Sequence, residues 1–111
     1  MKVPTLSLTT YSPGVYRLTA GQRKLIEQFI AKNLTDDTIF LVSGFASSSA
    51  DHELNLALST ERADAVVNFL VELTVPNDKV LQRAFGERFF SGNIPDFQVS
   101  QSVTIEAISP A

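Results

Sequence analysis

The sequence alternates between segments with the two-residue period of a strand and segments with the 3.6-residue period of a helix, which limits the folds open to it. Residues 6–11 (LSLTTY) alternate apolar and polar side chains and predict a strand. Residues 38–43 (TIFLVS) form a continuous apolar run, typical of a strand that is central in a sheet or covered on both faces. Residues 80–85 predict a third strand, and residues 99–108 contain a last one.

Two helices are predicted between these strands. Thr19 and Gln22 have the spacing of a capping box, in which each side chain bonds to the other residue's free backbone N–H. The first helix follows and runs to about Asn33, and the second covers residues 51–73. The residues expected on their apolar sides are Leu25, Ile26, Phe29 and Ile30 in the first helix and Leu54, Leu58, Val66, Leu70 and Leu73 in the second.

The predicted order is therefore β-α-β-α-β-β. We expect an α/β fold (an α+β two-layer sandwich) with two helices packed on one face of a mixed sheet. A length of 111 residues fits one domain spanning residues 1–111, because domains most often run about 100–150 residues. Residues 1–4 resemble an expression start on an excised fragment. Phe29, Phe40 and Phe69 are expected in the core.

Composition excludes several classes of function. The chain has no cysteine, so zinc ribbons, thiol nucleophiles, iron–sulfur clusters and disulfide scaffolds are excluded. Nine Lys and Arg against twelve Asp and Glu give a net charge of −3, which argues against nucleic-acid binding and a polybasic membrane anchor. No apolar run reaches the roughly 18–20 residues of a bilayer-spanning helix.

The sequence contains no recognisable catalytic motif. His52 is the only histidine and has no second imidazole with which to share a metal. Residues 44–47 (GFAS) do not form a G-x-S-x-G elbow, and there is no phosphate-binding loop. Asp51 and Glu53 are interpreted as the acidic N-terminus of a helix. We therefore predict no enzyme, no cofactor and no metal site.

One stretch carries a specific pattern. Gly44 is followed by Asn55, and residues 58–63 read LSTERA, which gives G-(x10)-N-x-x-L-S-x-x-R-A-x-x-V-x-x-x-L. This pattern resembles the OmpA-like domain, the peptidoglycan-binding module of outer-membrane protein A, Pal lipoproteins and flagellar MotB stators. The resemblance extends to residues 84–87 (AFGE), similar to a family G-Y-G-E, and to residues 103–106 (VTIE), similar to a final R-V-x-I strand.

The resemblance implies a ligand and a set of site residues. The family's ligand is the cell-wall stem peptide centred on diaminopimelate, whose carboxylate needs a cation and whose ammonium needs an acceptor. Arg62 can grip a carboxylate bidentately, and Asn55 lies two helical turns earlier on the same side. Ser47 and Ser48 complete the candidate peptidoglycan-binding set. Without the resemblance, the simpler interpretation of Arg62 is an ion pair with Glu61, Asp64 or Asp51.

The sequence departs from the family pattern at charged positions. The family's acidic residue, in G-H-T-D, falls on Ser47, its histidine on Phe45, and its next glycine on Ala50. The family's N-R-R-V becomes residues 100–103 (SQSV), which lose both arginines. A retained frame with altered charges predicts that peptidoglycan binding is weak or lost.

The expected function is a non-catalytic periplasmic scaffold or docking module in an envelope-spanning complex such as a secretion, pilus or motor-like assembly. The alternative is a genuine peptidoglycan anchor that uses Arg62 and Asn55. The expected partners are envelope proteins of the same assembly and peptidoglycan, with no nucleic acid and no membrane segment in this fragment. The resemblance also allows a homodimer, because MotB-like relatives dimerise, and it implies an anchor to the inner or outer membrane through a missing N-terminal segment.

Overall fold

The computed structural model describes residues 3–9, 11–47, 51–86 and 101–109. Its elements are β1 (Thr5–Leu8), α1 (Ala20–Asn33), β2 (Ile39–Gly44), α2 (His52–Glu72), a short 3₁₀ helix η1 (Asn77–Lys79), β3 (Val80–Ala84) and β4 (Val103–Ile108). The predicted β-α-β-α-β-β order is confirmed. The first strand is shorter than expected, because it ends at Leu8 and not at Tyr11.

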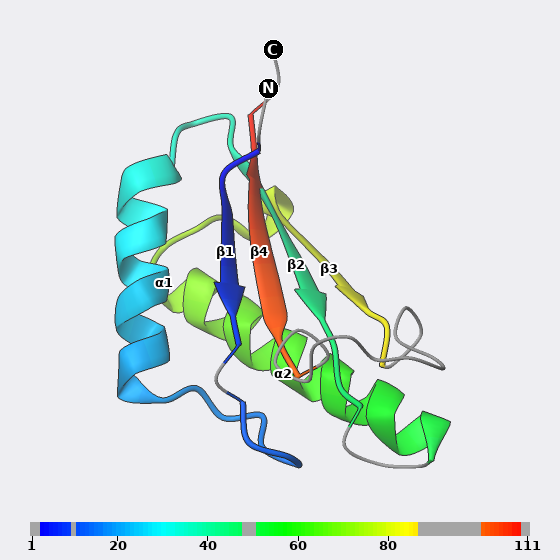
Figure 1. Ribbon diagram of the computed structural model, residues 1–111. Helices are drawn as coiled ribbons and strands as arrows, with labels where there is room; N and C mark the ends of the chain where they lie inside the picture. The colour runs from blue at the N-terminus through cyan, green and yellow to red at the C-terminus, as the bar shows by residue number, and fades with distance from the viewer. Residues whose placement is uncertain (1–2, 10, 48–50, 87–100, 110–111) are drawn as a thin grey trace.

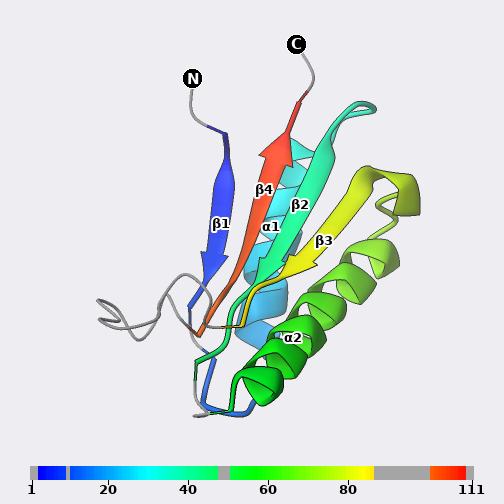
Figure 2. The same cartoon turned by 90° about the vertical axis from the view of Figure 1, so that its right-hand side faces the viewer.

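The four strands form one mixed sheet in the order β1-β4-β2-β3. β4 pairs antiparallel with both β1 and β2, whereas β2 and β3 are parallel. The continuous apolar run of β2 therefore occupies a central strand, as its pattern predicts. Figure 1 shows α2 running diagonally behind the strands, and Figure 2 shows the sheet turned by 90°.

The core lies between one face of the sheet and the two helices, in a two-layer arrangement. Alternate residues of the strands join residues of both helices in a single buried cluster. The cluster consists of Leu8, Tyr11, Ile26, Ile30, Phe40, Val42, Ala63, Val66, Leu70, Val75, Val103, Ile105 and Ala107. Phe29 and Phe69 pack against it from partly buried positions, and the rings of Phe29 and Phe40 meet edge to face at 6.3 Å.

Two leucines lie outside the core, contrary to the sequence prediction. Leu25 is 47% exposed and Leu54 is 60% exposed. In the first half of α2 the inward positions belong to the polar residues Asn55, Ser59 and Arg62. Hydrophobic periodicity assigns the wrong face there, because that half of the helix packs against a polar region at the end of the sheet.

Gly44 allows the close packing of α2 against the end of β2. A Cβ atom at this position would lie 2.2 Å from the carbonyl oxygen of Ser59, so no larger residue fits without moving the helix. The glycine of the sequence pattern therefore has a structural reason, and the contact fixes the first half of α2 beside the end of the sheet.

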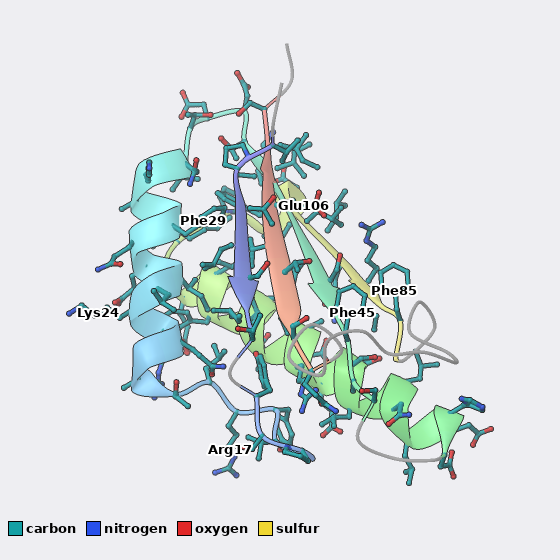
Figure 3. All side chains as sticks on the ribbon, viewed as in Figure 1. Arg17, Lys24, Phe29, Phe45, Phe85 and Glu106 are labelled. Carbon is teal, nitrogen blue, oxygen red and sulfur yellow. The ribbon has the colours of Figure 1, made fainter. Side chains whose placement is uncertain are left out.

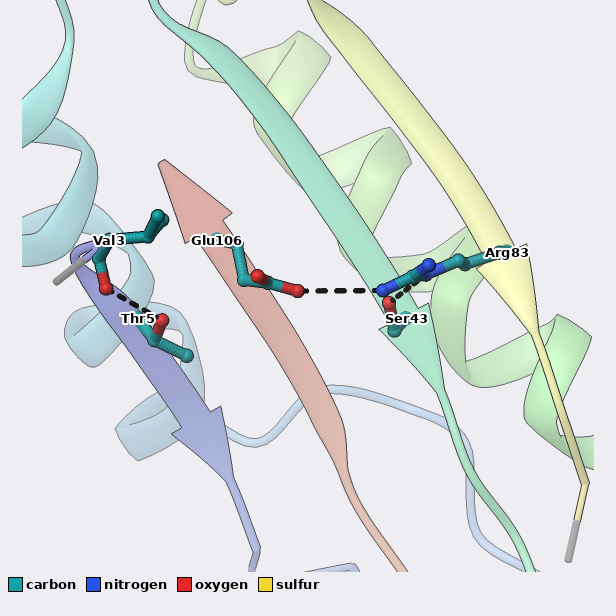
Figure 4. A network of polar contacts seen from close by, with 5 residues as sticks. All are labelled: Val3, Thr5, Ser43, Arg83 and Glu106. Atoms are coloured by element: carbon teal, nitrogen blue, oxygen red, sulfur yellow. Dashed lines mark hydrogen bonds and ion pairs between the residues drawn. The ribbon is translucent and has the colours of Figure 1, made fainter. Parts of the chain in front are cut away.

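No helix among the described residues covers the opposite face of the sheet. On that face Arg83 of β3 reaches across β2 (Figure 4). Its Nε donates to the Ser43 hydroxyl at 2.8 Å, and its Nη2 lies 3.6 Å from a carboxylate oxygen of Glu106. These contacts tie three strands together, and the ion pair is exposed enough to contribute little.

Candidate functional site

The candidate ligand residues meet at the end of the sheet where β2 stops and β4 starts. Arg62 and Asn55 both project from the inward face of α2 and are buried. Ser47 is half-buried and lies three residues beyond β2. Ser48 lies outside the described residues. Arg62 and Ser47 are therefore linked through Gln101, whereas Asn55 lies two turns earlier on the inward face of α2.

The guanidinium of Arg62 is bonded to oxygen atoms from three separate segments. Its Nε donates to the carbonyl of Val15 at 2.7 Å, and its Nη2 donates to the carbonyl of Ser12 at 3.0 Å. Its Nη1 donates to the carbonyl of Phe45 at 2.9 Å and to Oε1 of Gln101 at 2.7 Å. Arg62 has no exposed surface and is the largest fully buried side chain in the described structure. It thus fastens the segments before α1, after β2 and before β4 to α2.

All four of these acceptors are uncharged. Within the part of the chain that the structure describes, none of Glu61, Asp64 and Asp51 is a partner of Arg62. Asp64 accepts from Gln82 instead, and Asp51 caps α2 by accepting from the backbone N–H groups of its first turn. The simpler interpretation of Arg62 as a member of a local ion pair is therefore wrong, and the cation is held by dipoles.

Tyr11 covers one face of the guanidinium. The Cζ atom of Arg62 lies 4.7 Å from the centroid of the Tyr11 ring, a cation–π contact. Burial raises the pKa of Tyr11 to about 12, although the neighbouring guanidinium acts to lower it. Burial also lowers the pKa of Arg62, because leaving water disfavours the charged form. The Tyr11 hydroxyl is buried and has no hydrogen-bond partner in the described structure.

Gln101 links Arg62 to Ser47. Its Oε1 accepts from Arg62, and its Nε2 donates to the Ser47 hydroxyl at 3.3 Å. Sequence reasoning treated Gln101 only as a lost arginine and missed its contact with both candidates. The signal was present, because Gln101 and Ser47 are both positions where the family pattern has a charge. Ser12 and Val15 bind Arg62 through their backbone carbonyls, so their side chains gave no indication of this role.

Other residues of the sequence pattern fasten α2 to neighbouring segments. The Ser59 hydroxyl accepts from the backbone N–H of Gly86 at 3.0 Å and donates to the carbonyl of Leu56 at 2.8 Å. Gly86 has a φ of +56°, and a Cβ atom there would lie 3.1 Å from the backbone nitrogen of Leu56. Asn55 is 2% exposed and makes interactions of its own. Much of the pattern is therefore explained by packing.

An aromatic pair lies beside the site. The rings of Phe45 and Phe85 stack with centroids 5.5 Å apart and an interplanar angle of 23° (Figure 3). The Cζ atom of Arg83 lies 5.1 Å from the centroid of the Phe85 ring. Because the carbonyl of Phe45 also accepts from Arg62, this stack supports the segment that follows β2.

Comparison with known proteins identifies the family. Residues 10–93 match the sequence model of the OmpA family. The chain belongs to the OmpA family. The matched range includes Ser47, Asn55 and Arg62, and it ends before Gln101.

The relatives of this OmpA-family chain include outer membrane proteins A. The protein from Yersinia pseudotuberculosis is 33% identical over 93 residues, which cover 81% of this chain and 26% of the relative. The protein from Citrobacter freundii is 29% identical over 93 residues, which cover 81% of this chain and 39% of the relative. The chain thus spans between about a quarter and two fifths of the length of these curated relatives.

Solved structures of OmpA-like domains share the fold. The OmpA-like domain of FopA1 from Francisella tularensis aligns with a TM-score of 0.71 at 23% identity, over 96% of this chain and 77% of that one. A periplasmic domain of Helicobacter pylori MotB aligns with a TM-score of 0.75 at 16% identity, over 98% of this chain and 78% of that one. The peptidoglycan-associated lipoprotein of Burkholderia pseudomallei aligns with a TM-score of 0.73 at 17% identity, over 88% of this chain and 86% of that one. These neighbours establish two helices on a mixed four-stranded sheet.

The two departures from the OmpA pattern at positions 47 and 101 contact each other. Where the family pattern has an acid and an arginine, this chain has a hydroxyl and an amide joined by a hydrogen bond. The pair formed by Ser47 and Gln101 remains connected to Arg62 through the Gln101 amide oxygen.

Proposed function

We propose that this chain is a non-catalytic scaffold or docking module of a cell-envelope complex, in which peptidoglycan binding is weakened or lost. The observation that carries the proposal is the complete burial of Arg62, whose guanidinium makes four hydrogen bonds to oxygens of the protein itself. A ligand carboxylate would have to displace some of these bonds before it could be gripped. A group that fastens three segments is poorly placed to bind a ligand.

The second support is the missing acid. A diaminopimelate ammonium needs an acceptor, and Ser47 offers an uncharged hydroxyl that already receives a hydrogen bond from Gln101. Removing one partner of a buried charge pair typically costs about 2–5 kcal/mol. At 1.4 kcal/mol for each tenfold change, affinity falls by about 30-fold to several thousand-fold.

The alternative is a genuine peptidoglycan anchor that uses Arg62 and Asn55. One observation favours it: no acceptor of the Arg62 guanidinium carries a charge. A ligand carboxylate that replaced one of the carbonyls would bring a negative charge to a buried cation, and an arginine–carboxylate pair can form two parallel hydrogen bonds.

The proposed location is the periplasm, with an anchor to the inner or outer membrane supplied by a segment outside this sequence. The support is that one structural neighbour is a periplasmic domain of MotB and another is a peptidoglycan-associated lipoprotein. No helix of the described residues is long and apolar enough to span a membrane. A secretion, pilus or motor-like assembly is the proposed setting, and a homodimer is the oligomeric state to test there.

Co-sedimentation with purified sacculi tests the proposal. We expect the wild-type chain to remain in the supernatant. We expect the double variant Ser47→Asp/Gln101→Arg to pellet, because it returns the acid and one of the two arginines of the family pattern to positions that already contact each other. Far-ultraviolet circular dichroism reports whether each variant is folded.

The matched control makes the same charge changes on exposed surfaces. Ser7→Asp/Gln28→Arg adds one acid on β1 and one base on α1, and it is expected to stay in the supernatant. Pelleting of the wild-type chain would establish the anchor instead. A folded Ser47→Asp/Gln101→Arg variant that fails to pellet would refute the argument that these two departures weaken binding.

A further inference from the structure

A second candidate site lies between the start of α1 and the second half of α2. A groove of about 310 Å³ opens between the segment entering α1 and the second half of α2. Its lining consists of Tyr16, Arg17, Leu18 and Arg23 on one side and Ala65, Asn68, Phe69 and Glu72 on the other. We call it the α1–α2 groove. None of the candidate peptidoglycan-binding residues lines it, so it is separate from the site described above.

The groove combines an apolar floor with unpaired cations. Leu18 and Phe69 are partly buried against the core and form apolar lining. Arg17 and Arg23 are both exposed. Among the described residues, neither guanidinium group has a hydrogen-bond or ion-pair partner. Two guanidinium groups with all their donors available beside an apolar surface suit a ligand with both carboxylates and apolar side chains.

The charges around the groove oppose the helix dipoles. The first turn of α1 contains no acidic residue, and Arg23 follows directly. Glu72 is the last residue of α2, whose final turn contains no basic residue. A positive charge near a helix N-terminus and a negative charge at a C-terminus are both unfavourable. Charges that break a local stability rule are expected where they serve binding.

Charge is also segregated along the chain. Residues 1–35 carry five Lys or Arg and one Glu, a net charge of +4, whereas residues 36–111 carry four Lys or Arg and eleven acids, a net charge of −7. Arg17, Arg23 and Lys24 belong to the basic part. The lining itself holds two arginines and one glutamate, so the groove is positive on a chain whose net charge is −3, and it complements a negatively charged partner.

We propose that the α1–α2 groove docks a short acidic peptide segment of a partner protein, with carboxylates held by Arg17 and Arg23 and an apolar side chain seated on Phe69. The inference rests on the docking role proposed above and gives that role a site. A peptide fits better than a flat anionic membrane, because the apolar lining lies within a hollow that a single side chain can enter and a flat surface cannot.

A peptide titration followed by nuclear magnetic resonance tests the groove. The probe is a blocked pentapeptide of sequence Glu-Leu-Asp-Leu-Glu, and its control is the amide analogue Gln-Leu-Asn-Leu-Gln. We expect the acidic peptide to shift the backbone signals of Leu18, Ala65 and Phe69 in the isotope-labelled chain, and the amide analogue to leave them unchanged. Added salt should weaken the binding, because the carboxylate contacts are exposed.

Variants of the two arginines give the quantitative test. Arg17→Gln/Arg23→Gln is expected to weaken the acidic peptide by about five- to thirty-fold, the loss of two partly exposed charge-assisted contacts. The matched control Lys24→Gln/Lys32→Gln removes the same charge from α1, where Lys24 points away from α2 (Figure 3), and should change affinity less than about twofold. Glu72→Gln should strengthen binding by about two- to fivefold, because it removes the acid of the groove.

Equal losses of peptide affinity in the two double variants would indicate general charge attraction and would contradict a docking site in the groove. The proposal would also be contradicted if the acidic peptide left the signals of Leu18, Ala65 and Phe69 unchanged while vesicles of phosphatidylglycerol shifted them. The sacculus assay separates this inference from the proposed function. Pelleting of the wild-type chain overturns the loss of peptidoglycan binding, whereas a silent peptide titration overturns only the groove.

Discussion

Arg62 is a positive charge surrounded by neutral oxygens, and its role depends on the shape of the guanidinium as well as on its charge. The planar fork reaches the carbonyls of Ser12, Val15 and Phe45 and the amide of Gln101 at once. A lysine ammonium carries the same charge, but it has three donors and cannot span this set of acceptors. The residue therefore links segments that are far apart in the sequence.

Arg62→Lys is expected to lower the free energy of unfolding by about 2–4 kcal/mol, because buried acceptors are left without donors. Chemical denaturation followed by circular dichroism measures the change. Arg83→Lys is the matched control, since the Arg83 side chain is half exposed and its ion pair lies on the open face of the sheet. Its expected effect is within about 1 kcal/mol. Equal effects of the two substitutions would contradict the structural role of Arg62.

Tyr11 gives a pH-dependent prediction. Its pKa is raised by burial from 10.0 to about 12, so the folded chain holds the phenolic proton more tightly than the unfolded chain does. The stability contributed by the neutral phenol is present below pH 10 and is lost as the pH rises towards 12. The loss is on the order of 2–3 kcal/mol, at about 1.4 kcal/mol for each pKa unit.

Denaturation at a series of alkaline pH values measures this loss. The Tyr11→Phe variant is the control, because it keeps the ring over Arg62 but has no phenol to ionise. Its stability should fall less steeply between pH 10 and pH 12 than that of the wild-type chain. Parallel curves for the two proteins would show that the Tyr11 phenol is not protected.

The sequence pattern located the site but did not predict its geometry. Spacing placed Arg62 and Asn55 on one face of a helix, because helical periodicity is a local property. The partners of Arg62 come from residues up to 50 positions away, and three of them are backbone carbonyls, which every residue possesses. Gln101 was the one side-chain partner that the departures from the family pattern could have revealed.

The turn that ends α2 contains one residue in a strained backbone conformation, Thr74. The backbone N–H of Val75 bonds to the carbonyl of Leu70 at 3.0 Å, and that of Thr74 bonds to the carbonyl of Val71 at 2.9 Å. This is a Schellman motif, whose left-handed position is normally glycine. Thr74 occupies it with a φ of 69°, the only positive φ among the described residues other than glycine. A β-branched side chain is strained there.

Thr74→Gly is expected to raise the free energy of unfolding by about 0.5–1 kcal/mol, because the relief of strain exceeds the added entropy of the unfolded chain. Thermal denaturation measures the gain. Thr60→Gly, within the same helix, is the control and should destabilise by roughly 0.3 kcal/mol or more, because glycine is the poorer helix former. A loss of stability at position 74 would mean that the hydrogen bond from the Thr74 hydroxyl to the carbonyl of Leu73 outweighs the strain.

The elements themselves were predictable, because periodicity, capping residues and turn residues act locally. The capping box at α1 is present, with Gln22 N–H to Thr19 Oγ1 at 3.0 Å and the reciprocal bond at 2.9 Å. The exposed face of α2 was not predictable in its first half. There the inward residues are polar, so the hydrophobic pattern pointed to Leu54, which is exposed.

For the whole molecule, the OmpA fold is retained while the charges around Arg62 have changed. Packing accounts for the retained positions, since Gly44 and Gly86 each lie in close contact with α2, and Ser59 of α2 accepts from the backbone N–H of Gly86. The hydrogen bond between Ser47 and Gln101 occupies the positions at which the family pattern carries charge. Two exposed arginines whose side chains have no partner among the described residues, Arg17 and Arg23, line the α1–α2 groove, which directs the search for partners to that surface.

Isothermal titration of the wild-type chain with a diaminopimelate-containing muropeptide tests the central claim most directly. If Arg62 is held by the protein's own oxygens and the acid is absent, the titration will show no saturable binding, or only weak binding with a Kd of about 1 mM or above. Saturable binding with a micromolar Kd, abolished in a folded Arg62→Lys variant, would contradict the account and identify the chain as a peptidoglycan anchor.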